Sequence, residues 1–199
     1  EAIVMPVNLT WEEGASIPLT FMVVHDMLIA KGALARGEWL LVTGISSGVG
    51  VAALQLGKVL GAKVIGTSGS TVKLARLKAM GLDVGIQTRG ADFADPVMKA
   101  TDGKGANLVV NNVGGSMPRE FVKTSTRALE EAFHFNVSRA HALTRSALPQ
   151  LLVNGGSVVN ISSVMGRLAG RGFVAYGTVK EALAPLARLA APALAPRVR

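Results

Sequence analysis

The chain has 199 residues, 49% of them apolar and 17% charged, so it is long enough to bury a sizeable core and too apolar for a disordered segment. The absence of cysteine excludes disulfides and thiolate metal sites and fits a reducing compartment, so we expect a cytoplasmic protein. The net charge of +8 is not accompanied by clusters of Lys and Arg with aromatic residues, so we expect no nucleic-acid partner.

Residues 1–38 precede the first predicted strand and are expected to form a helical extension. Two stretches, 11–15 and 17–35, predict one or two amphipathic helices. The most apolar stretch, 17–30, is shorter than a membrane span and contains an aspartate. The first residues lack the basic region of a secretory signal, so we expect neither export nor membrane insertion.

From residue 39 to 199, short apolar runs alternate with helical stretches. The predicted strands are 40–44, 63–67, 83–88, 107–112 and 157–163, and the predicted helices are 48–60, 71–80, 95–101, 126–152 and one that begins near 175. Such alternation predicts an α/β fold, a doubly wound parallel Rossmann sheet with strand order 3-2-1-4-5. Pro185 and Pro192 predict that the last helix is kinked or shortened just past Lys180.

A glycine-rich turn follows the first predicted strand directly and opens a helix. Glycines there permit a tight turn and a close approach of the backbone to a pyrophosphate, which the positive end of the helix attracts. The residues expected to contact a dinucleotide are Thr43, Gly44, Ser46, Ser47, Gly48, Val49 and Gly50. The alternative is a structural turn that holds no ligand.

The end of the second predicted strand bears on the choice between NAD(H) and NADP(H). Residues 66–73 contain no Asp or Glu that would bind a ribose 2′-hydroxyl. Ser68 and Lys73 could instead hold a 2′-phosphate, which favours NADP(H) as the cofactor. The alternative is that Lys73 lies at a solvated helix start and binds nothing.

The only tyrosine, Tyr176, stands four residues before Lys180, thirteen after Ser163 and forty after Asn136. On one helix, Tyr176 and Lys180 share a face, and an ammonium beside a phenol stabilises its ionised form. Ser163 ends an apolar run, so its hydroxyl could reach the same point. The pattern indicates interconversion of a carbonyl and an alcohol, provided that a hydride donor lies opposite.

Residues 130–199 resemble the short-chain dehydrogenases/reductases in the segments 135–137, 159–163 and 176–180, and the segment 111–114 matches the same family. The resemblance implies that Tyr176 is the general acid/base and that Lys180 assists its ionisation and binds the nicotinamide ribose. It further implies that Ser163 polarises the substrate carbonyl and that Asn136 holds a water in a proton relay. The cofactor contacts implied at the fourth strand are Asn111, Asn112 and Gly114.

Residues 1 to about 115 resemble a second family, the zinc-independent medium-chain reductases of the quinone oxidoreductase type, in the segments 37–42, 46–58 and 61–67. The two resemblances meet near 107–115, so we expect a hybrid that changes family there and is truncated before a sixth strand. The medium-chain resemblance places a substrate lobe before this stretch, and we expect the chain to lack that lobe. The hypothesis that competes with an enzyme is therefore a chimeric or truncated Rossmann module that binds NADP(H) or only folds.

The expected partner is a small-molecule carbonyl or alcohol. We also expect a homo-oligomer through the helices at about 126–150 and 176–195, because the short-chain resemblance places a subunit interface there. The apolar residues on these helices are Ala140, Ala142, Leu143, Ala147, Leu183, Ala184, Leu186 and Ala187. His25, His134 and His141 lack the spacing of metal ligands, so no metal is expected.

Overall fold

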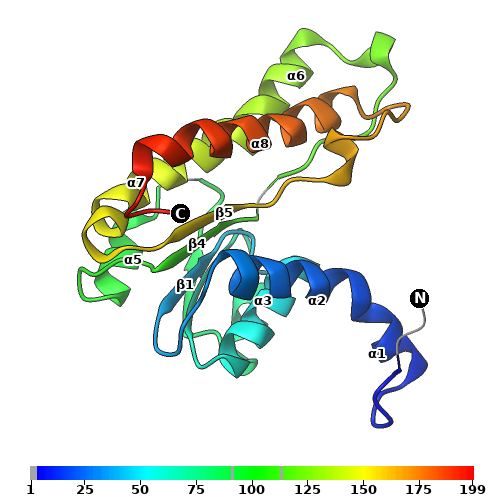
Figure 1. Ribbon diagram of the computed structural model, residues 1–199. Coiled ribbons are helices and arrows are strands. Elements are labelled where there is room, and N and C mark those ends of the chain that lie inside the picture. Colours follow the sequence, from blue (N-terminus) through cyan, green and yellow to red (C-terminus); the bar gives the residue numbers. More distant parts are fainter. Residues whose placement is uncertain (1–3, 91, 113) are drawn as a thin grey trace.

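The computed structural model describes residues 4–90, 92–112 and 114–199, and it contains a five-stranded parallel sheet with helices on both faces (Figure 1). The strands are β1 (Trp39–Val42), β2 (Lys63–Ser68), β3 (Val84–Gln87), β4 (Leu108–Asn111) and β5 (Ser157–Asn160). They pair in the order β3-β2-β1-β4-β5. The predicted fold class and strand order are confirmed, whereas Val113, inside the 111–114 motif, and residues 1–3 of the predicted extension lie outside the described residues.

The helices alternate with the strands as expected. They are α1 (Trp11–Ser16), α2 (Pro18–His25), the π-helix η1 (Asp26–Lys31), α3 (Gly48–Val59), α4 (Thr71–Ala79), α5 (Ala94–Ala100), the 3-10 helix η2 (Phe121–Lys123), α6 (Thr126–Phe133), the π-helix η3 (His134–Ser138), α7 (Arg139–Asn154), the 3-10 helix η4 (Val164–Gly166) and α8 (Val174–Leu194). Among the described elements no helix is long and apolar enough to cross a membrane. No group of three potential metal-ligating side chains occurs in the same ranges.

The two faces of the sheet carry separate apolar cores. Leu40 and Val42 of β1 face a core that α2, η1 and α3 complete, whereas Leu41 between them faces a core with α5 and α7. Side chains that alternate in this way are required of a strand that is covered on both faces. Val24 and Leu28 are fully buried in the first core, so part of the predicted N-terminal extension packs on the sheet itself.

Some predicted boundaries are wrong. The last helix is not shortened past Lys180, because α8 continues through Pro185 and Pro192 to Leu194. Its apolar face packs against α6 and η3 in a third core cluster, and this burial outweighs the backbone bonds lost at the prolines. The fifth strand ends at Asn160, where the chain turns toward α8.

The edge of the sheet beside β5 carries a short pairing. Gly156 and Val198 form a parallel bridge, and the Val158 N–H donates to the Arg199 carbonyl over 2.8 Å. The chain at 197–199 therefore lies where a sixth parallel strand would pair with β5.

Candidate active site

The turn between β1 and α3 has the backbone geometry expected of a phosphate-binding loop. Gly44 has a φ of +62°, which an L side chain rarely adopts. A Cβ at Gly50 would lie 2.5 Å from the Ile45 carbonyl oxygen, so only glycine permits this closeness. The Ser47 Oγ caps α3 by accepting from the Gly50 N–H over 3.1 Å. Gly48, by contrast, has open space around it, so a ligand can approach the start of the helix there.

Asn112, directly after β4, holds this turn in place. Its Nδ2 donates to the carbonyls of Thr43 and Gly44 over 3.2 and 3.3 Å and to the Ser47 Oγ over 2.8 Å. Its backbone N–H donates to the Thr43 Oγ1 over 3.0 Å. A residue predicted as a cofactor contact therefore orders the turn. The predicted contact Val49 packs against the apolar core.

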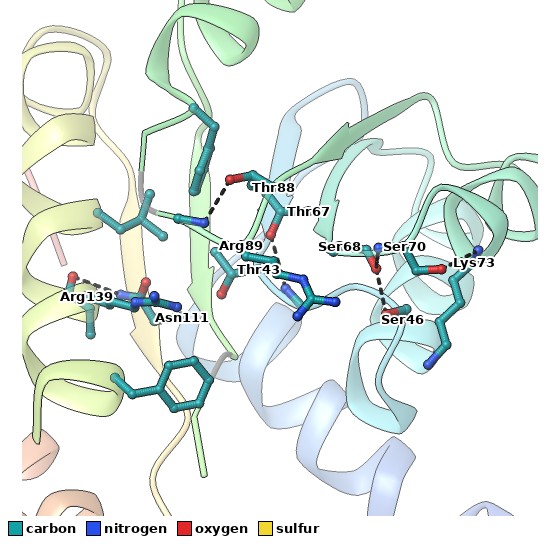
Figure 2. Close-up of a pocket in the computed structure, with 17 residues that line it drawn as sticks. Thr43, Ser46, Thr67, Ser68, Ser70, Lys73, Thr88, Arg89, Asn111 and Arg139 are labelled. Carbon is teal, nitrogen blue, oxygen red and sulfur yellow. Dashed lines mark hydrogen bonds between the residues drawn. The ribbon is translucent and has the colours of Figure 1, made fainter. Parts of the chain in front are cut away.

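A cavity of about 560 Å³ opens beside the turn, at the carboxyl ends of the strands (Figure 2). It is lined by Thr43, Gly44, Ser46, Thr67, Ser68, Gly69, Ser70, Lys73, Thr88, Arg89, Gly90, Phe93, Asn111, Phe135, Arg139, Ala140 and Leu143. The Ser46 and Ser68 hydroxyls are hydrogen-bonded over 3.0 Å, which joins the turn to the end of β2. The predicted 2′-phosphate residues, Ser68 and Lys73, thus lie on the same cavity as Ser46.

The structure adds two cationic residues that sequence analysis missed, Arg89 and Arg139, to the lining of this cavity (Figure 2). Arg89 follows the end of β3 by two residues, and the order β3-β2-β1 places that end beside the end of β2. The predicted strand order was therefore a signal that could have found it. Arg139 lies over the Phe135 ring at 5.0 Å, and its place on α7 gave no such signal.

Lys180 and Asn136 meet at the chain that follows β4. Lys180 is only 4% exposed, and its Nζ donates to the Ile161 carbonyl over 2.8 Å. Burial lowers the Lys180 pKa, because desolvation disfavours the ammonium. A Cβ at Gly114 would contact the Asn136 Oδ1 and would lie 2.6 Å from the Lys180 Nζ.

Asn136 is fixed by hydrogen bonds on both sides of its amide. Its Oδ1 accepts from the Gly115 N–H over 2.9 Å, and its Nδ2 donates to the carbonyls of Gly115 and Ala132 over 3.0 and 2.8 Å. It lies on the π-helix η3, a distortion that frequently occurs at functional sites. The asparagine is therefore locked beside the lysine.

Ser163 and Tyr176 lie on segments that pack together. The Ser163 Oγ accepts from the Met165 N–H over 3.2 Å at the start of η4. A Cβ at Gly177 would lie 2.7 Å from the Met165 carbonyl oxygen, so η4 packs closely against α8 next to Tyr176. In the described parts of the chain, no hydrogen bond joins Tyr176 to Ser163 or Lys180.

The four residues predicted for chemistry thus lie on connected elements, but none of them lines the 560 Å³ cavity. Asn111, which does line it, donates from Nδ2 to the Asn160 Oδ1 over 2.7 Å and so links β4 to β5. Asn111 lines the cavity, and Lys180 and Asn136 lie against Gly114, three residues further along the chain.

Comparison with known proteins identifies relatives across most of the chain. The family model described as short chain dehydrogenase matches residues 38–199. An uncharacterised oxidoreductase of Mycobacterium tuberculosis (strain CDC 1551 / Oshkosh) is 46% identical over 172 residues, which cover 80% of this chain and 65% of that protein. The chain thus spans less than two thirds of that relative.

Solved structures of short-chain dehydrogenases and related reductases also match most of the chain. A short-chain dehydrogenase from Streptomyces avermitilis matches with a TM-score of 0.75 at 35% identity, covering 82% of this chain and 63% of that one. A structure provisionally described as a betaketoacyl-ACP reductase matches with a TM-score of 0.73 at 26% identity, covering 82% of this chain and 70% of that one. The family match crosses residues 107–115, where a change of family was predicted, and none of these matches supports a medium-chain half.

Proposed function

Because the chain belongs to the short-chain dehydrogenase family, we propose that it is an NADP(H)-dependent oxidoreductase that interconverts a carbonyl and an alcohol. The observation that carries the proposal is the meeting of the buried Lys180 with Asn136 at residue 114, two residues past the asparagine that orders the glycine turn. Members of this family use a nicotinamide cofactor, and the described turn fits one.

The fit rests on space and charge. Gly48 leaves the start of α3 open, and the cavity beside it is lined by Lys73 and two arginines but by no described Asp or Glu. A pyrophosphate is attracted to such a helix start, and a 2′-phosphate to such cations. When bound, a reduced nicotinamide supplies the hydride that reduces a carbonyl carbon.

The protein's own part in the reaction is to handle one proton. The Tyr176 hydroxyl donates its proton to the carbonyl oxygen, and the Ser163 Oγ–H donates a hydrogen bond to the same oxygen. The Lys180 ammonium stabilises the phenolate that Tyr176 becomes. Asn136, held rigidly by its own hydrogen bonds, positions the water that returns the proton.

The substrates to test first are β-ketoacyl thioesters, since one structural relative is described as a betaketoacyl-ACP reductase. Simple ketones and aldehydes complete the panel. We further propose a cytoplasmic homo-oligomer formed through α6–α7 and α8. Ala140, Leu143 and Leu183 are buried within the chain, so the remaining apolar residues of these helices would supply that interface.

A second candidate is the non-catalytic module. It is favoured by two observations: the four residues predicted for chemistry do not line the cavity, and no hydrogen bond within the described ranges joins Tyr176 to Ser163 or Lys180. Catalytic side chains displaced by about 1 Å can lower the rate about a hundredfold.

The hybrid of two families and the domain boundary between residues 38 and 39 also remain predictions.

Replacing the phenol hydroxyl separates the candidates. We expect Tyr176→Phe to lower carbonyl reduction by at least about a hundredfold and to leave the NADPH Kd within about twofold, because the hydroxyl acts in the transition state and not in cofactor binding. NADPH oxidation on the substrate panel and NADPH fluorescence measure the two effects. Equal turnover by the variant contradicts the role of Tyr176, and binding by the wild type without turnover on any substrate favours the module.

A further inference from the structure

We propose that Arg89 is the residue that distinguishes NADP(H) from NAD(H), by binding the 2′-phosphate together with Lys73 and Ser68. The inference rests on the proposed function, since it assigns a residue within the same cofactor cavity. Arg89 was not expected to contribute, because it follows a different strand from the other two.

The position of Arg89 follows from the pairing of β2 and β3. Ser68 and Gln87 are register partners at the ends of these strands, and the Thr88 N–H donates to the Ser68 carbonyl over 3.0 Å. The Gly90 N–H in turn donates to the Thr88 Oγ1 over 2.9 Å, which fixes the turn that carries Arg89. The arginine is therefore anchored at its backbone beside Ser68.

The side chain of Arg89 lies on Gly69. A Cβ at Gly69 would lie 2.9 Å from both the Cγ and the Nε of Arg89, so the absence of a side chain there makes room for the arginine. Figure 2 shows the guanidinium extending into the cavity, between Thr43 and the group of Ser46, Ser68 and Lys73. Glycine at 69 thus lets the stem of Arg89 lie across the end of β2.

The electrostatics favour a phosphate at this point. Within the described part of the chain Arg89 forms no salt bridge, and no described Asp or Glu lines the cavity. A guanidinium presents several donors in a planar fork that matches phosphate oxygens, which an ammonium such as that of Lys73 cannot do. The guanidinium is thus available to bind a doubly charged group.

The position of Arg89 in the fold indicates that it binds the 2′-phosphate and not the pyrophosphate. A pyrophosphate is bound at the glycine turn and the start of α3, whereas the end of β2 receives the adenosine ribose of a doubly wound fold. Arg89 lies at the second place, over Gly69. An acid at the end of β2 would select the 2′-hydroxyl of NAD, and residues 66–73 contain none.

Calorimetric titration with 2′,5′-ADP and 5′-AMP tests the assignment without any turnover. We expect Arg89→Gln to weaken 2′,5′-ADP binding by about tenfold or more and to change 5′-AMP binding by less than about twofold. Arg76→Gln removes the same charge from α4 outside the cavity lining and should leave the ratio of the two affinities unchanged. NADPH and NADH titrations of the same variants should follow the same pattern.

Unchanged preference for 2′,5′-ADP in Arg89→Gln overturns the role of Arg89 while leaving the cofactor site in place. Equal losses for both nucleotides, or an equal loss in Arg76→Gln, overturn it as well, because they show a general effect of charge. A wild type that binds neither NADPH nor NADH overturns the proposed function itself, and Arg89 with it.

Discussion

The glycine turn follows the carboxyl end of β1, and Lys180 is bonded just past the carboxyl end of β5, but the two regions are built in different ways. The turn is held by hydrogen bonds from the side chain of Asn112, by the bond from the Gly44 N–H to the Thr67 Oγ1, and by the close packing of Gly50 against Ile45. On α8, by contrast, the lysine is buried and bonded to a backbone carbonyl. The contrast indicates that the cofactor side is ordered before a ligand arrives, whereas the proton-transfer side still has to align its tyrosine with a substrate.

Among the substitutions that test this contrast, the largest loss of kcat is expected from Gly114→Ala, because Gly114 lies where Asn136 and Lys180 meet. Its replacement by alanine brings a Cβ into contact with Asn136 and within 2.6 Å of the Lys180 Nζ. Because a displacement of about 1 Å can cost about a hundredfold in rate, we expect kcat to fall by about that factor. Steady-state kinetics measure it. Gly115→Ala is the matched control, since a Cβ there meets nothing within 4 Å, and equal losses in both variants would contradict the steric argument.

A smaller effect, confined to the cofactor side, is expected from Asn112→Ala. The variant removes the donors to Thr43, Gly44 and Ser47, so the turn loses its order before binding. Hydrogen bonds of this kind contribute about 1 kcal/mol each, so we expect the NADPH Kd to rise by about tenfold and kcat at saturation to change little. Fluorescence titration measures the Kd.

The control for that change is Asn154→Ala, which removes a side-chain amide that donates to the Lys104 carbonyl, away from the glycine turn. It should bind NADPH as the wild type does. An Asn112→Ala protein with unaltered affinity would mean that the turn keeps its shape without the amide, and the contrast between the two regions would then fail.

The smallest expected effect is a change in the pH dependence of stability that is caused by Lys180. Burial lowers the Lys180 pKa below its usual 10.5, so the unfolded chain binds this proton more tightly than the folded one does. The charged lysine therefore opposes folding at neutral pH, and this opposition decreases as the pH rises through the window between the folded pKa and 10.5.

We therefore expect the unfolding free energy of the wild type to rise, relative to that of Lys180→Met, between neutral pH and about pH 10. Urea denaturation of both proteins measures the difference. Lys99→Met, at an exposed position of α5, controls for the loss of one charge. If the difference in unfolding free energy stays constant or falls as the pH rises, the claim that burial disfavours the Lys180 ammonium is contradicted.

Sequence patterns sufficed for the parts of this fold that depend on local signals. Continuous apolar runs such as 40–42 predicted the buried strands, and a glycine turn between a strand and a helix predicted the loop at Gly44. The order 3-2-1-4-5 followed from right-handed connections between parallel strands.

What could not be read from the sequence depends on tertiary neighbours. The helix at Pro185 continues because packing against α6 and η3 compensates for the lost bonds, and no local signal reports that packing. Arg89 reaches the cavity because Gly69, directly after β2, leaves room for it. The hydrogen bond from Asn112 to Ser47 likewise connects segments that are far apart in the chain.

The central claim is that the glycine turn delivers a nicotinamide to the Tyr176 hydroxyl. A crystal structure with NADPH and an unreactive carbonyl analogue tests it directly. We predict that the ring lies with one carbonyl group between its C4 and the Tyr176 hydroxyl, with the reacting atoms about 3–3.5 Å apart. A dinucleotide bound in the cavity with its nicotinamide directed away from Tyr176 would contradict the account.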